Sequence, residues 1–332
     1  MKLASMLVIG ICALGASGRA QETVAAAKPA ADGAHEKAAG PGAGATEADL
    51  SPGTFSFDPA VAGAIEVKRV RTGHLLVRPV VNGVEAGWFI FDTGAGICVV
   101  STPHVAELGL AAAGTIDSVG VGGAVDAQLH RVASLVLGPL TLRDEPVMTT
   151  DLSFLKEHLG EEIVGVIGYG LLARCVAEID LATPAITLRD PAGYTLAAGH
   201  WTPVSLDDRI PMVDATFEGH EGRFRFDTGS NSSVTFHEPA VREARLLEGR
   251  EVSDSKLGGV GGFVAAKQGR LASFELCGLR AEKVPADFAL EAKGVYGDAR
   301  TAGSIGAGFL APYVVVTDYP NARLALRPRD AK

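Results

Sequence analysis

The strongest constraint on this chain is that it repeats itself, because a duplicated unit predicts one fold used twice. Phe91-Asp92-Thr93-Gly94 returns as Phe226-Asp227-Thr228-Gly229, 135 residues later. Four further blocks follow each copy in the same order, at offsets of 138 or 139 residues. In pairs, these blocks begin at Val121 and Val260, Arg131 and Arg270, Ile167 and Ile305, and Asp180 and Asp318. Five matched blocks in one order predict two homologous halves within a single polypeptide.

The segments around each aspartate have the pattern of β-structure. The apolar run Trp88–Phe91 follows the pair Asn82-Gly83, which suits the positive φ angles of a tight hairpin turn. Arg223–Phe226 alternates with the period of a half-buried strand. Each aspartate is therefore expected where a strand ends. Helices are expected to be short. Thr102-Pro103 opens one that Gly109 closes, and Glu238-Pro239 opens a second that reaches about Leu247.

The N-terminal segment predicts export. Residues 1–20 have the pattern of a secretory signal peptide: Lys2, an apolar run from Met6 to Leu14, and small residues before a cleavage point after Gly18 or Ala20. A membrane anchor is the disfavoured alternative, because a span needs about 20 apolar residues. We expect a periplasmic or secreted protein with no stable membrane span after cleavage. Residues 21–54 are expected to be a flexible Ala/Gly-rich tail, and a plain spacer is favoured over a removable pro-segment.

Composition and motif spacing exclude several classes of function. The formal net charge of −9 provides no basic surface for a polyanion, so nucleic acid is not an expected partner. Histidine and cysteine lack the spacing of metal sites, and neither a metal nor another cofactor is expected. Gly168–Ala173 and Gly306–Ala311 spell a dinucleotide-binding pattern, but the β pattern that follows leaves too little helix. The disulfide state of the remaining cysteines stays open, with buried thiols favoured, at Cys98, Cys175 and Cys277.

The two Asp-Thr-Gly copies carry the candidate chemistry. One copy alone is an ordinary turn sequence, but two matched copies can bring Asp92 and Asp227 face to face. Like charges at that distance cannot both ionise easily, so the pair shares a proton. The ionised member can then take a proton from water that attacks a peptide carbonyl, while the protonated member donates to the oxyanion. The supporting loop residues in this interpretation are Thr93, Gly94, Thr228, Gly229 and Ser230.

With these motifs the chain resembles the retropepsin-type aspartic peptidases over most of residues 75–190 and 210–328, with both halves in one polypeptide as in the pepsins. The resemblance implies a mostly β protein of two tandem β-barrel lobes, 55–200 and 201–328, related by a pseudo-twofold axis and carrying short helices. It also implies that Val166-Ile167-Gly168 and Ser304-Ile305-Gly306 cross behind the catalytic loops. Glycine-rich flaps would close over substrate, with the residues Val121, Gly122, Gly123, Val260, Gly261 and Gly262.

The function implied by the resemblance is an aspartic endopeptidase, a monomer that cleaves extended peptides between hydrophobic residues with the catalytic pair Asp92 and Asp227. The halves differ after the motif, where Ala95 stands in one and Ser230 in the other. We hypothesise that the Ser230 hydroxyl stabilises the charge on Asp227 and makes Asp227 the base. Two alternatives remain: a non-hydrolytic module that binds peptides by strand addition, and an obligate dimer that pairs lobes between chains.

Overall fold

The computed structural model describes residues 7–8 and 49–329. The predicted signal peptide, apart from Leu7–Val8, and the spacer up to residue 48 lie outside the described residues. Residues 49–53, which we expected to belong to the spacer, are instead held against both halves of the chain. The amide of Gly53 donates to Glu145 Oε2 at 2.9 Å, and Arg209 Nη2 donates to the carbonyl of Leu50 at 3.2 Å.

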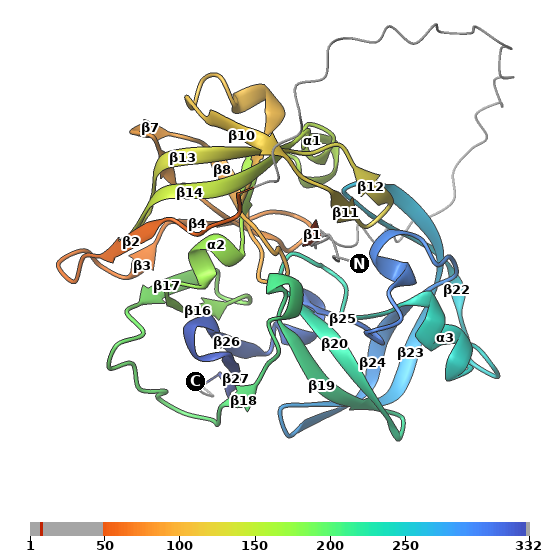
Figure 1. Cartoon of the computed structure of the whole chain (residues 1–332). Coiled ribbons are helices and arrows are strands. Elements are labelled where there is room, and N and C mark those ends of the chain that lie inside the picture. The colour runs from red at the N-terminus through yellow and green to blue at the C-terminus, as the bar shows by residue number, and fades with distance from the viewer. Residues whose placement is uncertain (1–6, 9–48, 330–332) are drawn as a thin grey trace, which may run out of the picture.

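The N-terminal half forms a curled sheet in the upper part of Figure 1. Its strands run in the order β4-β5-β8-β15-β9-β14-β13-β6-β7, with β2 paired to β14 and β10 paired to β13. The sheet lies on a core of aliphatic and aromatic side chains that alternate along the strands. The strands are β2 (Thr54–Phe57), β4 (Val67–Arg69), β5 (Leu75–Val77), β6 (Val80–Val81), β7 (Val84–Glu85), β8 (Trp88–Phe91), β9 (Val99–Ser101), β10 (Ala111–Thr115), β13 (Gln128–Leu137), β14 (Leu140–Thr150) and β15 (Ile163–Ile167).

A second, small sheet carries the first glycine-rich hairpin. It joins β11 (Ser118–Gly120) to β12 (Gly123–Val125), and the short strand β1 (Leu7–Val8) pairs in parallel with β11. The predicted hairpin at Asn82-Gly83 is also confirmed, because both residues have positive φ angles of 50° and 84° between the paired strands β6 and β7.

The C-terminal half repeats the architecture in a sheet of seven strands at the lower right of Figure 1. Its order is β19-β20-β25-β21-β24-β23-β22, with an additional pairing between β19 and β23. Here the second glycine-rich hairpin, β22–β23, is continuous with the sheet. The strands are β19 (Met212–Phe217), β20 (His220–Asp227), β21 (Val234–Phe236), β22 (Ser253–Gly259), β23 (Gly262–Leu276), β24 (Leu279–Ala289) and β25 (Gly303–Gly306).

A third large sheet joins the two halves. Its order is β18-β27-β26-β16-β17-β3, and the junction is the antiparallel pair β16–β26, in which Val176 lies opposite Asp318. Strands from both halves thus share one set of hydrogen bonds, which fixes the lobes relative to each other. The strands are β3 (Ala64–Ile65), β16 (Val176–Asp180), β17 (Ala185–Arg189), β18 (Thr202–Pro203), β26 (Tyr313–Asp318) and β27 (Arg323–Pro328).

The helices of the described residues are short, as expected, and shorter than the two predicted from the prolines. Thr102 begins a 3₁₀ turn that ends at His104, and the helix from Glu238 ends at Glu243. The α-helices are α1 (Leu155–Leu159), α2 (Tyr169–Leu172), α3 (Glu238–Glu243) and α4 (Ala307–Leu310). The 3₁₀ helices are η1 (Thr102–His104), η2 (Asp207–Arg209), η3 (Gly294–Gly297) and η4 (Tyr319–Asn321). The mostly β fold of two tandem lobes is confirmed.

Equivalent strands position the two motifs. In the first lobe β8 pairs in parallel with β15, and β9 pairs with β15 from the other side. In the second lobe β20 and β21 flank β25 in the same way. The segment predicted to cross behind each motif is therefore the strand between the two arms of the motif loop. This arrangement places Ile167 beside Phe91 and Ile305 beside Phe226.

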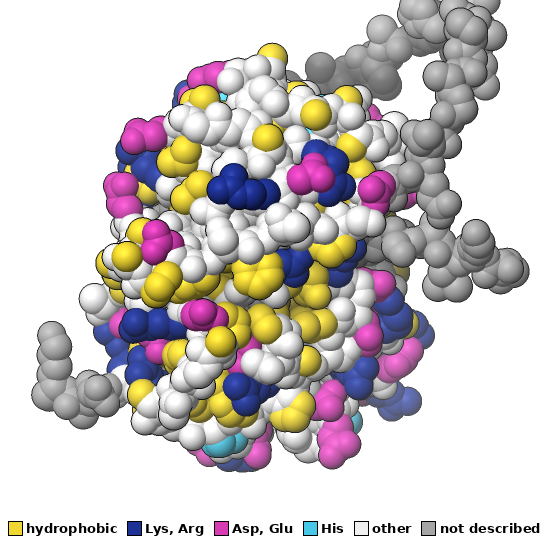
Figure 2. Space-filling model, turned by 60° about the vertical axis from the view of Figure 1, so that its left-hand side comes forward, with side chains coloured by type: hydrophobic (Ala, Val, Ile, Leu, Met, Phe, Trp, Pro, Cys, Tyr) yellow, Lys and Arg dark blue, Asp and Glu magenta, His cyan; other side chains and the backbone are white. Residues whose placement is uncertain are grey.

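On the face drawn in Figure 2, basic and acidic side chains are interspersed, so neither charge forms a large patch there. No helix among the described residues is long and apolar enough to cross a membrane. The cysteines at 98, 175 and 277 are buried and unbridged.

Candidate active site

Asp92 and Asp227 lie next to each other where the two lobes meet. Asp92 directly follows β8 and Asp227 is the last residue of β20, so both carboxyl groups stand at strand ends. The two residues are 0% and 2% exposed, and their carboxyl groups lie close enough for each to shift the pKa of the other. Asp92 Oδ2 and Asp227 Oδ1 have no hydrogen-bond partner among the described residues. These two oxygens are therefore available to a reacting group.

The threonines of the two motifs bind the loops to each other. The amide of Thr93 donates to Thr228 Oγ1 at 3.1 Å, and the amide of Thr228 donates to Thr93 Oγ1 at 2.9 Å. Each hydroxyl then donates across to the other lobe, Thr93 to the carbonyl of Phe226 at 3.2 Å and Thr228 to that of Phe91 at 3.3 Å. All four bonds cross the junction and are related by the pseudo-twofold axis. They hold the backbones of both aspartates at a fixed separation.

The glycines of the motifs allow this close approach. A Cβ at Gly229 would lie 2.3 Å from Cγ of Asp92, and a Cβ at Gly94 would lie 2.8 Å from Cγ of Asp227. Such distances are well inside van der Waals contact, so any larger residue would displace the opposite carboxyl group. The amide of Gly94 also donates to Asp92 Oδ1 at 2.7 Å.

The two carboxyl groups are electrostatically unequal. Burial raises the pKa of Asp92 to about 6, against which the shared hydrogen bond from Asp227 and the Gly94 amide act to lower it. The pKa of Asp227 is raised well above its usual value, because burial is reinforced by the negative charge of Asp92. The positive charge of Arg225 offsets part of that rise, although Arg225 is itself paired with Asp298 at 2.6 Å. This difference favours the proton on Asp227 and the negative charge on Asp92.

The contacts of Ser230 contradict our hypothesis that its hydroxyl keeps Asp227 charged. The Ser230 hydroxyl is buried and has no hydrogen-bond partner among the described residues. Its backbone is bonded on both sides, because the Ser230 amide donates to the carbonyl of Asp227 at 3.3 Å and its carbonyl accepts from Ala307 at 2.7 Å. Backbone bonds thus set the place of Ser230 in the loop, and its side chain provides no charge stabilisation to Asp227.

The tips of the two glycine-rich hairpins meet. The amide of Gly122 donates to the carbonyl of Val260 at 3.1 Å. A Cβ at Gly122 would clash with the carbonyl oxygen of Gly261, because it would lie far inside van der Waals contact. Gly123 and Gly262 begin the return strands β12 and β23.

Each hairpin also places one buried valine in the opposite lobe. Val121 packs with Ile210 and Val295 of the C-terminal half, while Val260 joins the cluster of the N-terminal half that contains Ala95. Ala95 directly follows the first Asp-Thr-Gly motif, so this cluster includes a residue of the first aspartate loop. The two predicted flap segments are thus in contact with each other at their tips.

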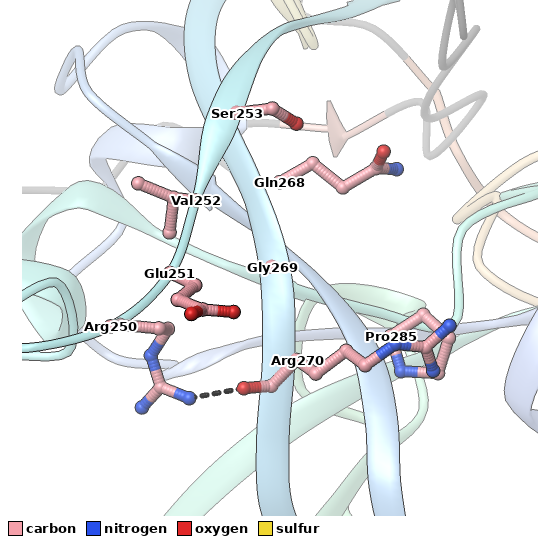
Figure 3. Close-up of a pocket in the computed structure, with 8 residues that line it drawn as sticks. All are labelled: Arg250, Glu251, Val252, Ser253, Gln268, Gly269, Arg270 and Pro285. Carbon is pink, nitrogen blue, oxygen red and sulfur yellow. Dashed lines mark hydrogen bonds between the residues drawn. The ribbon is translucent and has the colours of Figure 1, made fainter.

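A surface hollow on the C-terminal lobe is separate from this site (Figure 3). It has a volume of about 710 Å³ and neither aspartate lines it. Arg250 points from its wall toward the carbonyl of Arg270, and its guanidinium is already paired with Glu218 at 2.6 Å. Its charge is therefore neutralised within the lobe. The lining residues are Arg250, Glu251, Val252, Ser253, Gln268, Gly269, Arg270 and Pro285.

Two buried side chains that our sequence interpretation did not select also contact the aspartate loops. The hydroxyl of Tyr319 donates to the carbonyl of Thr93 at 2.7 Å, and His74 Nε2 lies 3.0 Å from the carbonyl of Gly229. Both residues lie outside the four-residue motifs, and neither has a polar counterpart in the other copy. The sequence repeat therefore gives no signal for Tyr319 or His74.

Comparison with known proteins agrees with the duplication. A family model described as aspartyl protease matches the chain twice, over residues 77–171 and 213–309. Each matched segment contains one Asp-Thr-Gly motif, one glycine-rich hairpin and one Ile-Gly segment. No curated protein matches the chain.

Proposed function

Because the chain belongs to the aspartyl protease family, we propose that it is an endopeptidase with a single active site between its two lobes. The observation that carries the proposal is the buried pair Asp92 and Asp227, held by the reciprocal threonine bonds, with the pKa of both carboxyl groups raised. Two carboxyl groups with separated pKa values provide an acid and a base in one site. A binding module would have no need of two buried carboxyl groups, whose desolvation destabilises the fold.

The roles in this proposal follow the unequal pKa values. Asp92, as the ionised member, accepts a proton from the water that attacks the scissile carbonyl. Asp227, as the protonated member, donates a hydrogen bond to the carbonyl oxygen as negative charge develops there. The tetrahedral intermediate then breaks down as the proton returns to the leaving nitrogen. Asp227 is thus the acid and Asp92 the base, the reverse of our hypothesis from the sequence.

The assay that tests the proposal is hydrolysis of a mixed peptide library by the purified chain, produced both whole and from Gln21. We expect cleavage between hydrophobic residues, blocked by pepstatin. The value of kcat/KM should rise with pH through a limb near the pKa of Asp92, about 6, since Asp92 must be ionised. Peptide binding without cleavage at any pH would instead support the non-hydrolytic peptide-binding module.

The flap contact gives a further prediction. In the Gly122→Ala variant the added Cβ would collide with the backbone of Gly261, so the two tips could not close in their present geometry. Because closure over substrate is the step affected, KM should rise about tenfold while kcat changes less. The measurement is steady-state kinetics on one peptide. Ala124→Ser, at an exposed position of the same hairpin, is the matched control and should leave KM unchanged. An unchanged KM in Gly122→Ala would show that tip contact plays no part in substrate binding.

We also propose, from the sequence, that the protein acts as a monomer after export, on extended peptides and not on nucleic acid. The lobes of one chain already supply both aspartates, so a complete site needs no second copy.

A further inference from the structure

Each aspartate loop is held by a buried donor that comes from the other half of the chain. Tyr319, the first residue of η4, donates to the carbonyl of Thr93 in the N-terminal loop. His74, which directly precedes β5, contacts the carbonyl of Gly229 in the C-terminal loop. Their exposed fractions are 3% for both residues, so water does not compete for these bonds.

Tyr319 reaches the carboxyl group of Asp92 through one rigid unit. The carbonyl of Thr93 and the amide of Gly94 belong to the same planar peptide group, so rotation of one end moves the other. The hydroxyl of Tyr319 binds the carbonyl end at 2.7 Å, while the amide end donates to Asp92 Oδ1 at 2.7 Å. A hydrogen bond to the carbonyl also polarises the peptide and strengthens the donor at its amide end. Tyr319 thus supports the charged form of Asp92 without touching it.

His74 acts on the equivalent turn by a different peptide group. The carbonyl of Gly229 shares a peptide plane with the amide of Ser230, which donates to the carbonyl of Asp227 at 3.3 Å and closes the turn. Because a carbonyl can only accept, the proton of His74 lies on Nε2, and its Nδ1 accepts from the Thr72 hydroxyl at 2.7 Å. Burial lowers the pKa of His74 to about 4, so the ring is neutral at higher pH and keeps this tautomer.

Neither donor is repeated in the other copy. Ile90 and Arg225 each stand two residues before the motif aspartate, and they pair with Leu76 and Met212. Leu76 and Met212 are therefore equivalent, and two residues earlier His74 is equivalent to Ile210. The matched blocks at Asp180 and Asp318 make Leu181 the equivalent of Tyr319. Both equivalents are buried hydrophobic residues. The hydrogen bonds between the two loops are therefore symmetric, whereas the side chains that bind the loops from outside the motifs are not.

We propose that Tyr319 and His74 are positioning residues of the aspartate pair: Tyr319 orients the peptide that binds Asp92, and His74 fixes the turn that carries Asp227. This inference rests on the proposed function. Other charged groups also lie near the two donors, among them Asp318, which directly precedes Tyr319 and is paired with Arg323 at 2.7 Å. Arg225 acts on Asp227, and the ring of Tyr169, which stacks on Tyr319 with centroids 6.2 Å apart, lies under Arg209.

The first test is the Tyr319→Phe variant, which removes one hydroxyl and keeps the ring stacked on Tyr169. Weakening the Gly94 amide destabilises the charged form of Asp92, so its pKa rises and the acid limb of kcat/KM moves upward by about half a pH unit or more. We expect kcat to fall about tenfold with KM within about twofold, since the loss falls on the reacting group. Tyr313→Phe, on β26, the strand that directly precedes η4, is the control and should change neither. A Tyr319→Phe profile that overlays the parent would overturn the proposal for Tyr319.

The second test compares His74→Leu with His74→Gln. Glutamine can donate from its side-chain amide to the carbonyl of Gly229, whereas leucine cannot. We expect His74→Leu to lose about tenfold or more in kcat and His74→Gln to recover part of that loss. His130→Leu is the matched control, because His130 is also buried and also contacts a threonine, Thr149, at 3.1 Å, but lies on β13. Equal activity in the two His74 variants would overturn the proposal for His74.

A measurement that needs no turnover separates this inference from the proposed function. Carboxyl ¹³C resonances of the full chain, with Asp92→Asn used for assignment, report the titration of Asp92 directly. A higher midpoint in Tyr319→Phe than in the parent supports the positioning role even if no variant cleaves a peptide, in which case only the proposed function fails. A parent that cleaves peptides, together with an unmoved midpoint and unmoved kinetics, overturns the positioning role and leaves the proposed function standing.

Discussion

The Asp92→Asn variant is expected to lose kcat/KM by a factor of about 1,000 or more while remaining folded. Asparagine has nearly the shape of aspartate and can still accept from the Gly94 amide, but it cannot take a proton from water. Asp227→Asn should lose a comparable factor, because an amide is too weak an acid to give up its proton as negative charge develops on the carbonyl oxygen. The measurement is kcat/KM on a peptide cleaved by the parent. Asp190→Asn, at an exposed position, is the matched control.

The same variant should become more stable above pH 6, which separates loss of chemistry from loss of fold. The pKa of Asp92 is about 6 in the folded chain and near 3.8 when unfolded, so the folded state binds more protons between these values. The stabilising effect of the protonated carboxyl is therefore present below about pH 4 and is lost as pH rises through 6. At neutral pH the buried charge costs about 3 kcal/mol at most, from the shift of about two units.

Urea unfolding at about pH 4 and pH 7 measures this effect. The parent should lose free energy of unfolding between the two pH values, and Asp92→Asn should lose less. An Asp92→Asn protein that is both inactive and less stable at pH 7 would mean that the carboxylate supports the fold, against our assignment of its charge to catalysis. Activity retained in both Asp92→Asn and Asp227→Asn would rule out the aspartate pair as the site.

The repeat was sufficient to predict the pairing of the aspartates, since equivalent loops on equivalent strands must meet if the lobes are related by a twofold axis. The predicted strand ends are found at Phe91 and Asp227, and the Ile-Gly segments lie between the arms of each loop. The sheet that joins the halves was not predicted. Its pairing of Val176 with Asp318 spans more than a hundred residues, and local periodicity contains no information about such a partner.

The properties that distinguish the two halves were the least predictable. Ser230 differs from Ala95 in the sequence, and a hydroxyl next to a carboxyl group is a reasonable source of asymmetry. The structure shows that the hydroxyl is unbonded and that the side chains outside the motifs differ instead: Arg225 with Asp298, and Tyr319 on the carbonyl of Thr93. These contacts depend on how the lobes pack, so a one-residue difference in a motif could not reveal them.

The Gly229→Ala variant is expected to be nearly inactive, and more so than Gly94→Ala. The new Cβ at position 229 would lie 2.3 Å from Cγ and 2.4 Å from Oδ2 of Asp92, so the base itself must move. At position 94 the nearest atom is Cγ of Asp227 at 2.8 Å, which requires a smaller shift. A displacement of about 1 Å at a reacting group costs on the order of a hundredfold in rate. We therefore expect a loss of about a hundredfold or more for Gly229→Ala and a smaller loss for Gly94→Ala.

The graded order of these losses is the decisive part of the prediction. Gly249→Ala is the control, because Gly249 has a positive φ of 67° but nothing within 4 Å of an added Cβ. Gly249→Ala introduces backbone strain, because alanine disfavours a positive φ, but its new methyl group does not contact the aspartates. If strain alone explained the losses, Gly249→Ala would be the most impaired of the three in stability and activity, since only Gly249 has a left-handed backbone. If the separation of the carboxyl groups governs the rate, kcat should fall in the order Gly249→Ala, Gly94→Ala, Gly229→Ala, as the added methyl comes closer to the carboxyl group of the opposite lobe.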